Sequence, residues 1–197
     1  MEGNSNIRMV SIADAPWQDV QTVFGTRGDP SSCWCQYFKM GKADWRNATR
    51  ATCEPLLEKQ VRESDPPPGV IAYLENEPVG WCAVEPRRNY PELHRTRVQS
   101  DPEPDDDPSI WSVTCFVVRV GFRKKGIATA LLAGAIEQAR SHGARVLEGY
   151  PVDPTAREKV ASAELYYGIV SQFTANGFTE VARPRPDRAL MRLELSA

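Results

Sequence analysis

The sequence has 197 residues, of which 41% are hydrophobic, 25% charged and 9% aromatic, and its formal net charge is −2. This length and composition are typical of one soluble globular domain, spanning residues 1–197. The slightly acidic balance argues against binding to nucleic acid or to an anionic membrane, and no apolar run reaches the roughly 20 residues of a membrane span. The N-terminal residues MEGNSNIRMV lack the pattern of a signal peptide, so we expect a cytoplasmic protein.

Five cysteines and two histidines limit the redox and metal chemistry of the chain. The number of cysteines is odd and no CxxC pair occurs, so a disulfide framework is not expected in the cytosol. Cys82 and Cys115 lie within apolar runs, where a free thiol behaves as a small hydrophobic side chain. With only His94 and His142 available, we expect no metal site.

The first half of the chain is predicted to contain a strand, two helices and a β-hairpin. Residues 6–12 alternate like a strand, and residues 13–24 form a short helix with Asp14 as its cap. Residues 44–63 form a second helix, which opens at Asp44 and ends before SDPPPG. The hairpin pairs GVIAYLE with VGWCAVE around the turn NEP.

A polar segment follows the hairpin at about residues 86–109. It contains several prolines, among them Pro86, Pro91, Pro102 and Pro108, and the acidic run SDPEPDDDPS, which predicts an exposed and mobile loop. A solvated insertion is favoured over a functional lid.

The second half alternates strands and helices. A central strand is predicted at 110–118, a helix from about Gly126 to Ser141, a strand at 144–150, a helix at 157–175, and a closing pair of strands at 178–183 and 189–195. Together these elements predict an α/β fold with a mixed, mostly antiparallel sheet of about seven strands and helices on both faces.

A cationic turn joins the central strand to the helix that follows it. It reads GFRKKGIATALL over residues 121–132, with two glycines around three basic side chains. A helix N-terminus offers unpaired N–H groups and partial positive charge, and Gly126 lets a ligand oxygen approach the main chain, so the turn indicates a phosphate site. It is not a Walker A motif, because Ile127 and Ala128 stand where Lys and Ser or Thr are required. The GxGxxG dinucleotide pattern is absent as well.

This turn resembles motif A of the GNAT acyltransferases, a family that uses acetyl-CoA. That motif reads (Q/R)-x-x-G-x-(G/A), and RKKGIA at residues 123–128 matches every specified position. The predicted order of elements is also the GNAT order over essentially the whole chain, and FTANGF near the C-terminus resembles the late helix of the family. The resemblance therefore implies a GNAT-like fold, and it allows a homodimer.

The resemblance also implies where acetyl-CoA binds as co-substrate. The strand before the turn would hydrogen-bond the pantetheine arm, having separated from its parallel neighbour at 144–150, and the turn would bind the pyrophosphate. The implied residues are Phe116, Val117 and Val118 for the arm, and Arg123, Lys124, Lys125, Gly126, Ile127, Ala128 and Thr129 for the pyrophosphate.

The usual acid and base of the family are missing from their expected positions. Ser112 stands where many members carry a Glu base, and Phe173 stands where they carry a Tyr acid. Tyr166 and Tyr167 are the candidates for the acid, because Tyr166 lies seven residues before Phe173, on the same face of the predicted helix.

Two carboxylates are the candidates for the base. Glu148 lies on the strand that should flank the thioester, and Glu85 ends the hairpin. Our hypothesis is that one of them removes the proton of the acceptor amine through a chain of water molecules.

Aromatic residues indicate where the acceptor binds. The segment CWCQYF, at residues 33–38, lies where GNAT folds commonly shape the acceptor pocket. The candidates are Trp34, Tyr37 and Phe38 from this segment, with Trp81 and Trp111 from the strands. Simple hydrophobic packing under a loop is an equal alternative.

The sequence thus predicts an acetyl-CoA-dependent N-acetyltransferase that acts on the amine of a small molecule by direct attack in a ternary complex. Cys115 as an acyl carrier is disfavoured relative to a core role. The competing hypothesis is a catalytically weak or inactive CoA-binding sensor with the same fold, which the loss of the usual Glu and Tyr would support.

Overall fold

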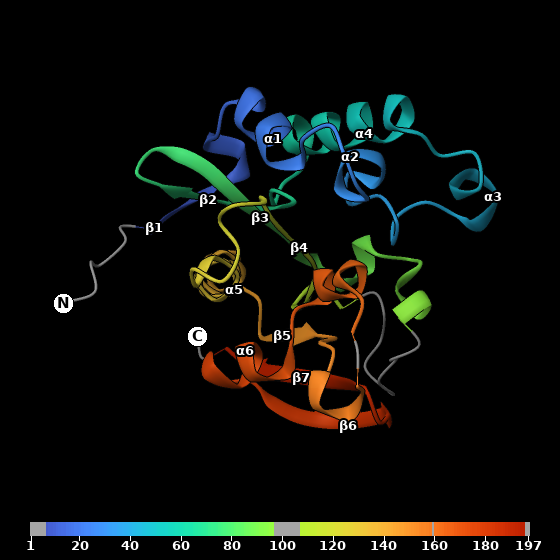
Figure 1. Cartoon of the computed structure of the whole chain (residues 1–197), viewed down its shortest axis with the longest axis vertical. Helices are drawn as coiled ribbons and strands as arrows, with labels where there is room; N and C mark the ends of the chain where they lie inside the picture. The colour runs from blue at the N-terminus through green and yellow to red at the C-terminus, as the bar shows by residue number, and fades with distance from the viewer. Residues whose placement is uncertain (1–6, 97–106, 159, 196–197) are drawn as a thin grey trace.

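The computed structural model describes residues 7–96, 107–158 and 160–195, which form a single mixed sheet and the helices around it (Figure 1). The strands are β1 (Ile7–Ser11), β2 (Gly69–Leu74), β3 (Glu77–Pro86), β4 (Ile110–Val118), β5 (Val146–Gly149), β6 (Thr179–Arg185) and β7 (Arg188–Glu194). Their order in the sheet is β1-β2-β3-β4-β5-β7-β6, and only β4 and β5 pair in parallel. The predicted α/β class with a mostly antiparallel sheet of seven strands is confirmed.

Helices cover both faces of this sheet, in two groups (Figure 1). The first group precedes the hairpin and consists of α1 (Trp17–Phe24), α2 (Pro30–Cys33), α3 (Lys42–Trp45) and α4 (Arg50–Glu63). The second group, on the opposite face, consists of α5 (Ile127–Ser141) and α6 (Val170–Ala175). Five short 3-10 helices complete the described elements: η1 (Ile12–Asp14), η2 (Arg87–Asn89), η3 (Leu93–Thr96), η4 (Pro154–Ala156) and η5 (Ser162–Tyr167).

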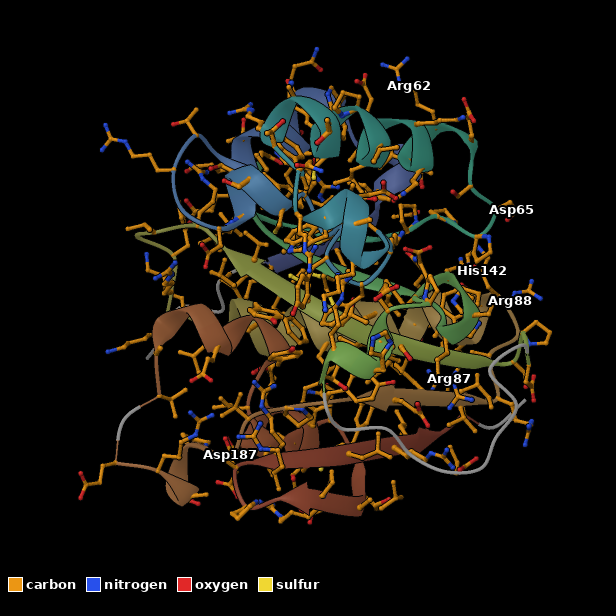
Figure 2. The ribbon with its side chains drawn as sticks, turned by 90° about the vertical axis from the view of Figure 1, so that its right-hand side faces the viewer. Arg62, Asp65, Arg87, Arg88, His142 and Asp187 are labelled. Carbon is orange, nitrogen blue, oxygen red and sulfur yellow. The ribbon has the colours of Figure 1, made fainter. Side chains whose placement is uncertain are left out.

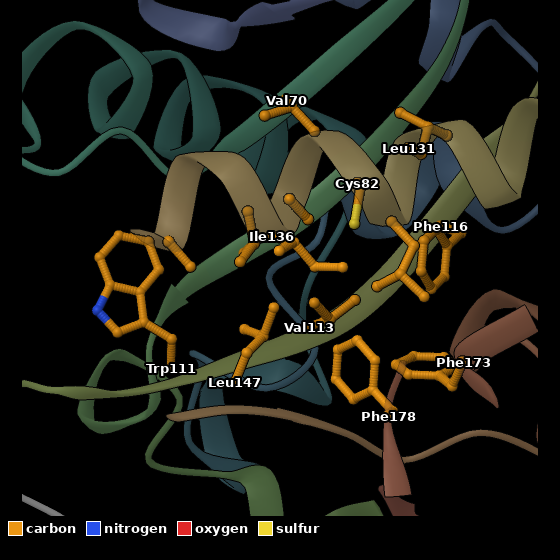
Figure 3. Packing of buried hydrophobic residues seen from close by; sticks show 14 of the residues in the cluster. Val70, Cys82, Trp111, Val113, Phe116, Leu131, Ile136, Leu147, Phe173 and Phe178 are labelled. Carbon is orange, nitrogen blue, oxygen red and sulfur yellow. The ribbon is translucent and has the colours of Figure 1, made fainter. Parts of the chain in front are cut away.

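Helix α5 builds the core on its face of the sheet. Its buried apolar side chains recur at helical spacing: Ile127, Leu131, Leu132, Ala135, Ile136 and Ala139. Figure 3 shows this helix across β3 and β4, with Trp111 at one end of the cluster and Phe116, Phe173 and Phe178 at the other. The packing fixes α5 and its N-terminal turn against the sheet.

The helices before the hairpin build a second core on the other face. Trp34 stacks on Phe24, with 4.6 Å between ring centroids and 4° between planes. Both are buried together with Val20, Leu57 and Trp81.

Two predicted helix starts are wrong. The first helix begins at Trp17 after Pro16, and Asp14 belongs to η1 instead of capping it. The helix predicted over 44–63 is two helices, because Thr49 begins α4 as an N-cap in a reciprocal capping box with Thr52.

The helix predicted over 157–175 is also interrupted. Gly168 has a φ of 76°, a left-handed conformation that no α-helix continues through. It separates η5 from α6, so the argument that placed Tyr166 two helical turns before Phe173 fails.

The segment after β3 is packed rather than exposed over residues 87–96. Arg87, Tyr90, Leu93 and Thr96 are buried there, so the prediction of an exposed loop is wrong for this part. Residues 97–106 lie outside the described residues. None of the helices in the described ranges combines the length and apolar character needed to cross a bilayer.

Candidate functional site

The two parallel strands separate partway along their length. β4 pairs with β5 only from Ile110 opposite Val146 to Val113 opposite Gly149. On its other edge the pairing with β3 shifts, because Ala83 faces Cys115 while Val84 faces Val113, which leaves Thr114 as an extra residue in a bulge. In the described sheet, residues 115–118 therefore have no strand partner on the β5 side.

This open edge presents backbone groups of β4. The Arg119 N–H donates to Val79 O over 3.0 Å, so by antiparallel alternation the Val117 N–H also points toward β3. The N–H groups of Phe116 and Val118 then point to the open side. Two of the three predicted arm-binding residues can thus offer their amides to an added strand-like ligand.

The turn after β4 leaves the N-terminus of α5 without a cap. Gly126 takes the N-cap position with a φ of 76°, and no side chain caps the helix. A Cβ at Gly126 would meet nothing within 4 Å, so the space above it is open. Within the part of the chain that the structure describes, the N–H groups of residues 123–126 donate no backbone hydrogen bond. Those of Ile127, Ala128 and Thr129 lie in the first turn, where no intrahelical acceptor exists.

The basic side chains of the turn have no acidic partner. In the described ranges no carboxylate pairs with Arg123, Lys124 or Lys125, whereas Arg119 is bound to Glu77 at 2.8 Å. The turn therefore combines free amides, a helix N-terminus and unpaired positive charge. This donor set suits the pyrophosphate of a nucleotide cofactor such as CoA.

Two buried residues hold the first turn of α5 in place. Ile127 is 2% exposed and packs into the core, so its contribution to a ligand is its amide. The carbonyl oxygen of Ala128 accepts a hydrogen bond from Gln172 Nε2 over 2.7 Å, which ties α6 to this turn.

Phe173 is a core residue and is not available for catalysis. It is fully buried, and its ring fills the space above Gly149, where a Cβ would lie 2.0 Å from it. The ring also meets Phe116 edge to face. A tyrosine is thus replaced by a core residue at this position, as the sequence indicates.

The tyrosine pair of η5 lies beside the open edge of β4 instead. Tyr166 and Tyr167 have ring centroids 4.1 Å apart, and Tyr166 packs against the core that contains Cys115 and Val117. Burial, followed by the neighbouring Tyr167, raises the pKa of Tyr166 above its usual range. Its hydroxyl group is therefore a neutral donor at physiological pH.

The two candidate carboxylates lie in one row across the sheet, on either side of Ser112. Glu85 is the register partner of Ser112 on β3, and Glu148 is its partner on β5. Neighbouring strands are about 4.8 Å apart, so each carboxylate lies one strand away from Ser112, the position at which the sequence resemblance predicts a base.

Glu148 is enclosed by donors. Arg192 Nε donates to it over 2.8 Å, Arg87 Nη1 over 3.3 Å and the Tyr150 hydroxyl over 3.0 Å, and that hydroxyl also bonds Ser112 Oγ at 2.9 Å. The side chain is 1% exposed. These contacts make Glu148 the centre of a buried ion-pair network.

Glu85 has a simpler environment. Its carboxylate pairs with Lys39 and accepts a hydrogen bond from Asn89 Nδ2 over 2.9 Å. Lys39 lines a groove of about 600 Å³ between the α2–α3 segment and α4, together with Gln36 and Gln60. The Lys39 side chain thus connects the buried Glu85 to a surface groove.

The three predicted acceptor tryptophans are in the hydrophobic cores. Trp34 and Trp81 are fully buried on the α1–α4 face, and Trp111 is 1% exposed on the α5 face. Their indoles are covered by protein atoms, since Trp34 stacks on Phe24 and Trp81 Nε1 contacts Cys35 Sγ. The prediction that they line an acceptor site is corrected accordingly.

Tyr37 and Phe38, in contrast, lie with the tyrosines of η5. The Phe38 and Tyr167 ring centroids are 6.0 Å apart, and half-buried Tyr37 packs on Phe38 at 4.8 Å. Of the predicted acceptor residues, these two are the ones that the structure brings to the proposed proton donors.

Cys115 has the character of a core thiol. A hydrogen bond with Cys35, followed by burial, raises the pKa of Cys115 well above the usual value. A thiol is a much weaker nucleophile than a thiolate, which argues against acyl transfer through this residue. Among the described residues, no group of three or more His, Cys, Asp or Glu side chains is arranged to hold a metal ion.

Sequence reasoning missed the basic residues of the site. Lys39, Arg87, Arg188 and Arg192 come from three separate segments, since the last two share β7, and each meets its partner only in the folded chain. No local motif marks them, since single basic residues are common in all of these segments.

Comparisons with known proteins agree with this geometry. The model of the acetyltransferase (GNAT) family matches residues 34–166, and no curated protein matches the sequence. An N-acetyltransferase from Staphylococcus aureus Mu50 has a similar structure, with a TM-score of 0.57 and 15% identity over 98% of this chain and 100% of that one.

Two further solved structures share the fold. YncA from Salmonella typhimurium, solved with acetyl-CoA, has a TM-score of 0.55 at 16% identity over 98% of this chain and 95% of its own. A ribosomal-protein-alanine N-acetyltransferase from Brucella melitensis has a TM-score of 0.55 at 18% identity, over 95% and 99%. The uncapped turn, the separated strands and the family match over two thirds of the sequence lead to one conclusion: this chain belongs to the GNAT family of acetyltransferases, whose co-substrate is acetyl-CoA.

Proposed function

We propose that the protein transfers the acetyl group of acetyl-CoA to the amine of a small molecule, by direct attack in a ternary complex. In this reaction a nitrogen–carbon bond forms and the carbon–sulfur bond of the thioester breaks, while the amine loses a proton and the thiolate gains one. The observation that carries the proposal is the α5 N-terminus: it is uncapped, open above Gly126 and surrounded by basic side chains that have no acidic partner among the described residues.

The turn and β4 are proposed to hold the co-substrate. The side chains of Arg123, Lys124 and Lys125 supply charge, and the amides of residues 123–129 supply donors for the pyrophosphate. The amides of Phe116 and Val118 orient the pantetheine arm along the open edge of β4. Acetyl-CoA supplies an activated thioester, and the high pKa of Cys115 supports direct transfer without an acyl-enzyme.

Proton movement is assigned to Tyr166 and Glu85. Tyr166 lies beside the open edge with a neutral hydroxyl, which suits it to donate a proton to the departing sulfur. Glu85 is favoured over Glu148 as the final proton acceptor, because two arginines and a tyrosine already occupy the Glu148 oxygens. A water chain is proposed to connect Glu85 with the amine.

The first experiment is thermal unfolding with acetyl-CoA, CoA or ATP–magnesium. A ligand present at about 100 times its Kd adds about 2.7 kcal/mol, which raises the Tm by several degrees. We expect a shift with acetyl-CoA and with CoA that is lost in Arg123→Glu and in Gly126→Asp. The Asp carboxylate would itself occupy the helix N-terminus and repel phosphate.

Arg62→Glu is the matched control, because it makes the same change of charge at an exposed position of α4, remote from the turn (Figure 2). A larger shift with ATP–magnesium, or none with CoA, would contradict the assignment of the turn. Stabilisation by CoA without CoA release from acetyl-CoA, over a broad panel of amines, would instead favour a CoA-binding sensor.

A further inference from the structure

One buried charge in the described part of the chain has no counter-charge. Arg188, at the start of β7, is 7% exposed; among the described residues, no carboxylate lies within ion-pair distance of it and its Nη1 has no hydrogen-bond partner. The other buried acidic and basic side chains of the described residues all have ionic partners. These pairs are Glu85 with Lys39, Arg87 and Arg192 with Glu148, and Asp187 with Arg157.

Arg188 packs on the side chain of Tyr167. Its guanidinium carbon lies 3.9 Å from the centroid of the Tyr167 ring, a cation–π contact. This contact offsets only part of the cost of removing a charge from water, because the ring supplies no negative group and Nη1 remains unbonded. Asp187, the residue before Arg188 in the β6–β7 turn, is bound to Arg157 at 2.5 Å. Figure 2 shows that Asp187 also lies well apart from Arg87.

The position of Arg188 links it to the proposed reaction centre. Its backbone bridges to Val152, just beyond the end of β5 and on the side where β4 and β5 separate. The Tyr167 ring on which it stacks lies 4.1 Å from the ring of Tyr166 and 6.0 Å from Phe38. One aromatic ring therefore separates this unpaired cation from the proposed proton donor.

We infer that the acceptor is an amine that carries one carboxylate group, as amino acids do, and that Arg188 binds this carboxylate. The inference rests on the proposed function, because it names the substrate class of the same site. A guanidinium binds a carboxylate through parallel N–H donors, and the bond is strong where water is excluded. A single uncompensated positive charge matches a monoanion, and the reactive form of an amino acid, with its amine neutral, is a monoanion. A phosphorylated amine would leave excess negative charge.

Paired acceptors test this directly. α-, β- and γ-amino acids are compared with their carboxamides, which keep the amine and the shape but lack the charge, and CoA release is measured. We expect kcat/KM to be at least about tenfold higher for the best amino acid than for its amide. In Arg188→Met the ratio should fall to about one, and Arg188→Lys should retain part of it. Arg185→Met is the matched control on the same hairpin, where an exposed arginine pairs with Asp187, and it should keep the full ratio.

A binding measurement separates this inference from the proposed function. Amino acids that bind should raise the Tm of the CoA complex for the wild type but not for Arg188→Met, whether or not turnover occurs. If amides and amino acids release CoA equally well, the carboxylate site is wrong and the acetyl transfer stands. If the amino acids raise the Tm without CoA release, the carboxylate site stands and the transfer fails. Arg188→Met should fold, because it removes a buried charge that lacks a counter-charge; if it does not, the Arg188→Lys ratio decides.

Discussion

At the scale of single residues, Ser112 stands where the sequence resemblance predicts a catalytic base, and it has a carboxylate on each side. These carboxylates are Glu85 and Glu148. The three are register partners on β3, β4 and β5, so their side chains share one face of the sheet. The serine hydroxyl cannot accept a proton at neutral pH, but a carboxylate stands one strand away on each side. Their partners differ, since Glu148 meets two arginines and Glu85 meets one lysine. The two carboxylates should therefore respond differently to neutralisation.

Glu148→Gln should mainly reduce stability. It leaves Arg87 and Arg192 facing a neutral amide in a buried network, and breaking such a network costs about 3–5 kcal/mol. Urea unfolding should show this as a lower midpoint. Glu85→Gln, the matched variant, should lose less stability and reduce kcat instead. Equal stability of Glu148→Gln and the wild type would contradict the structural role of this carboxylate.

Tyr166→Phe should reduce kcat roughly 100-fold, the range found for general acid catalysis, and leave the Tm shift with acetyl-CoA unchanged. The ring is retained, so packing against Tyr167 persists and only the proton donor is lost. Tyr73→Phe is the control, since that hydroxyl bonds Asp19 at 2.6 Å, on the α1 side of the sheet. A variant with wild-type kcat would move the role of acid to Tyr167 or to water.

At the scale of elements, the segment from η5 to α6 positions the site through close packing rather than through helix continuity. Gly168 breaks the helix and directs its chain past Val152, whose N–H donates to Gly168 O over 3.0 Å. After this break Phe173 inserts its ring above Gly149, at the last register pair before β4 and β5 separate. The opening between the strands thus depends on the absence of a side chain at position 149.

Gly149→Ala should therefore destabilise the protein and displace α6. Its Cβ would lie 2.0 Å from the Phe173 ring, so the ring must move, and overpacking of this kind costs about 1–3 kcal/mol. For a chain of this size each kcal/mol lowers the Tm by about 2–4 °C, which differential scanning calorimetry resolves. Gly41→Ala is the control, because its Cβ would meet nothing within 4 Å and its Tm should change little. An unchanged Tm in Gly149→Ala would show that α6 is loosely packed.

The strand, turn and helix proposed to bind the cofactor could be predicted from sequence because they are contiguous. Strand, turn and first helical turn follow one another in residues 110–129, so local pattern and glycine placement define the arrangement. The proposed acceptor side is assembled from residues near 38, 85, 167 and 188, which are distant in sequence. Aromatic composition alone could not separate Trp34, which fills the core, from Phe38, which lies beside Tyr167.

Arg188 illustrates the same limit. Its significance lies in the absence of a described carboxylate within ion-pair distance, a property that exists only in the folded chain. In sequence it is one of several arginines around PRPD, and its neighbour Arg185 is paired and exposed.

At the scale of the whole molecule, the two faces of the sheet differ in how their buried groups titrate. The α5 face is almost entirely apolar, whereas the opposite face buries phenols and thiols among its aromatic residues. Burial is the leading cause that raises the pKa of Tyr90, Tyr150, Tyr166 and Tyr167, and it raises the pKa of Cys33 to about 12. The folded chain thus retains protons that the unfolded chain releases in alkaline solution.

This difference predicts a loss of stability at high pH. Unfolded thiols and phenols ionise near pH 8.5 and 10, while their folded counterparts stay protonated, so the folded state binds more protons above these values and stability falls as pH rises. Each fully buried phenol should contribute about 1.4 kcal/mol per pH unit above pH 10. Below the pKa values of the unfolded chain these groups are protonated in both states, so their full contribution to stability is present. The Tm should therefore be level near neutrality and fall steeply above about pH 10.

Tm values measured from neutral to alkaline pH, with the absorbance of tyrosinate recorded in parallel, test the prediction. Buried phenols should ionise together with unfolding instead of one by one near pH 10. Tyr90→Phe removes one fully buried phenol. The free energy of unfolding of this variant should therefore fall less steeply with pH than that of the wild type, by about 1.4 kcal/mol per pH unit above pH 10. A gradual rise of tyrosinate absorbance in a chain that stays folded would mean that water reaches these phenols. The aromatic residues around Tyr166 and Arg188 would then be open to solvent rather than dry.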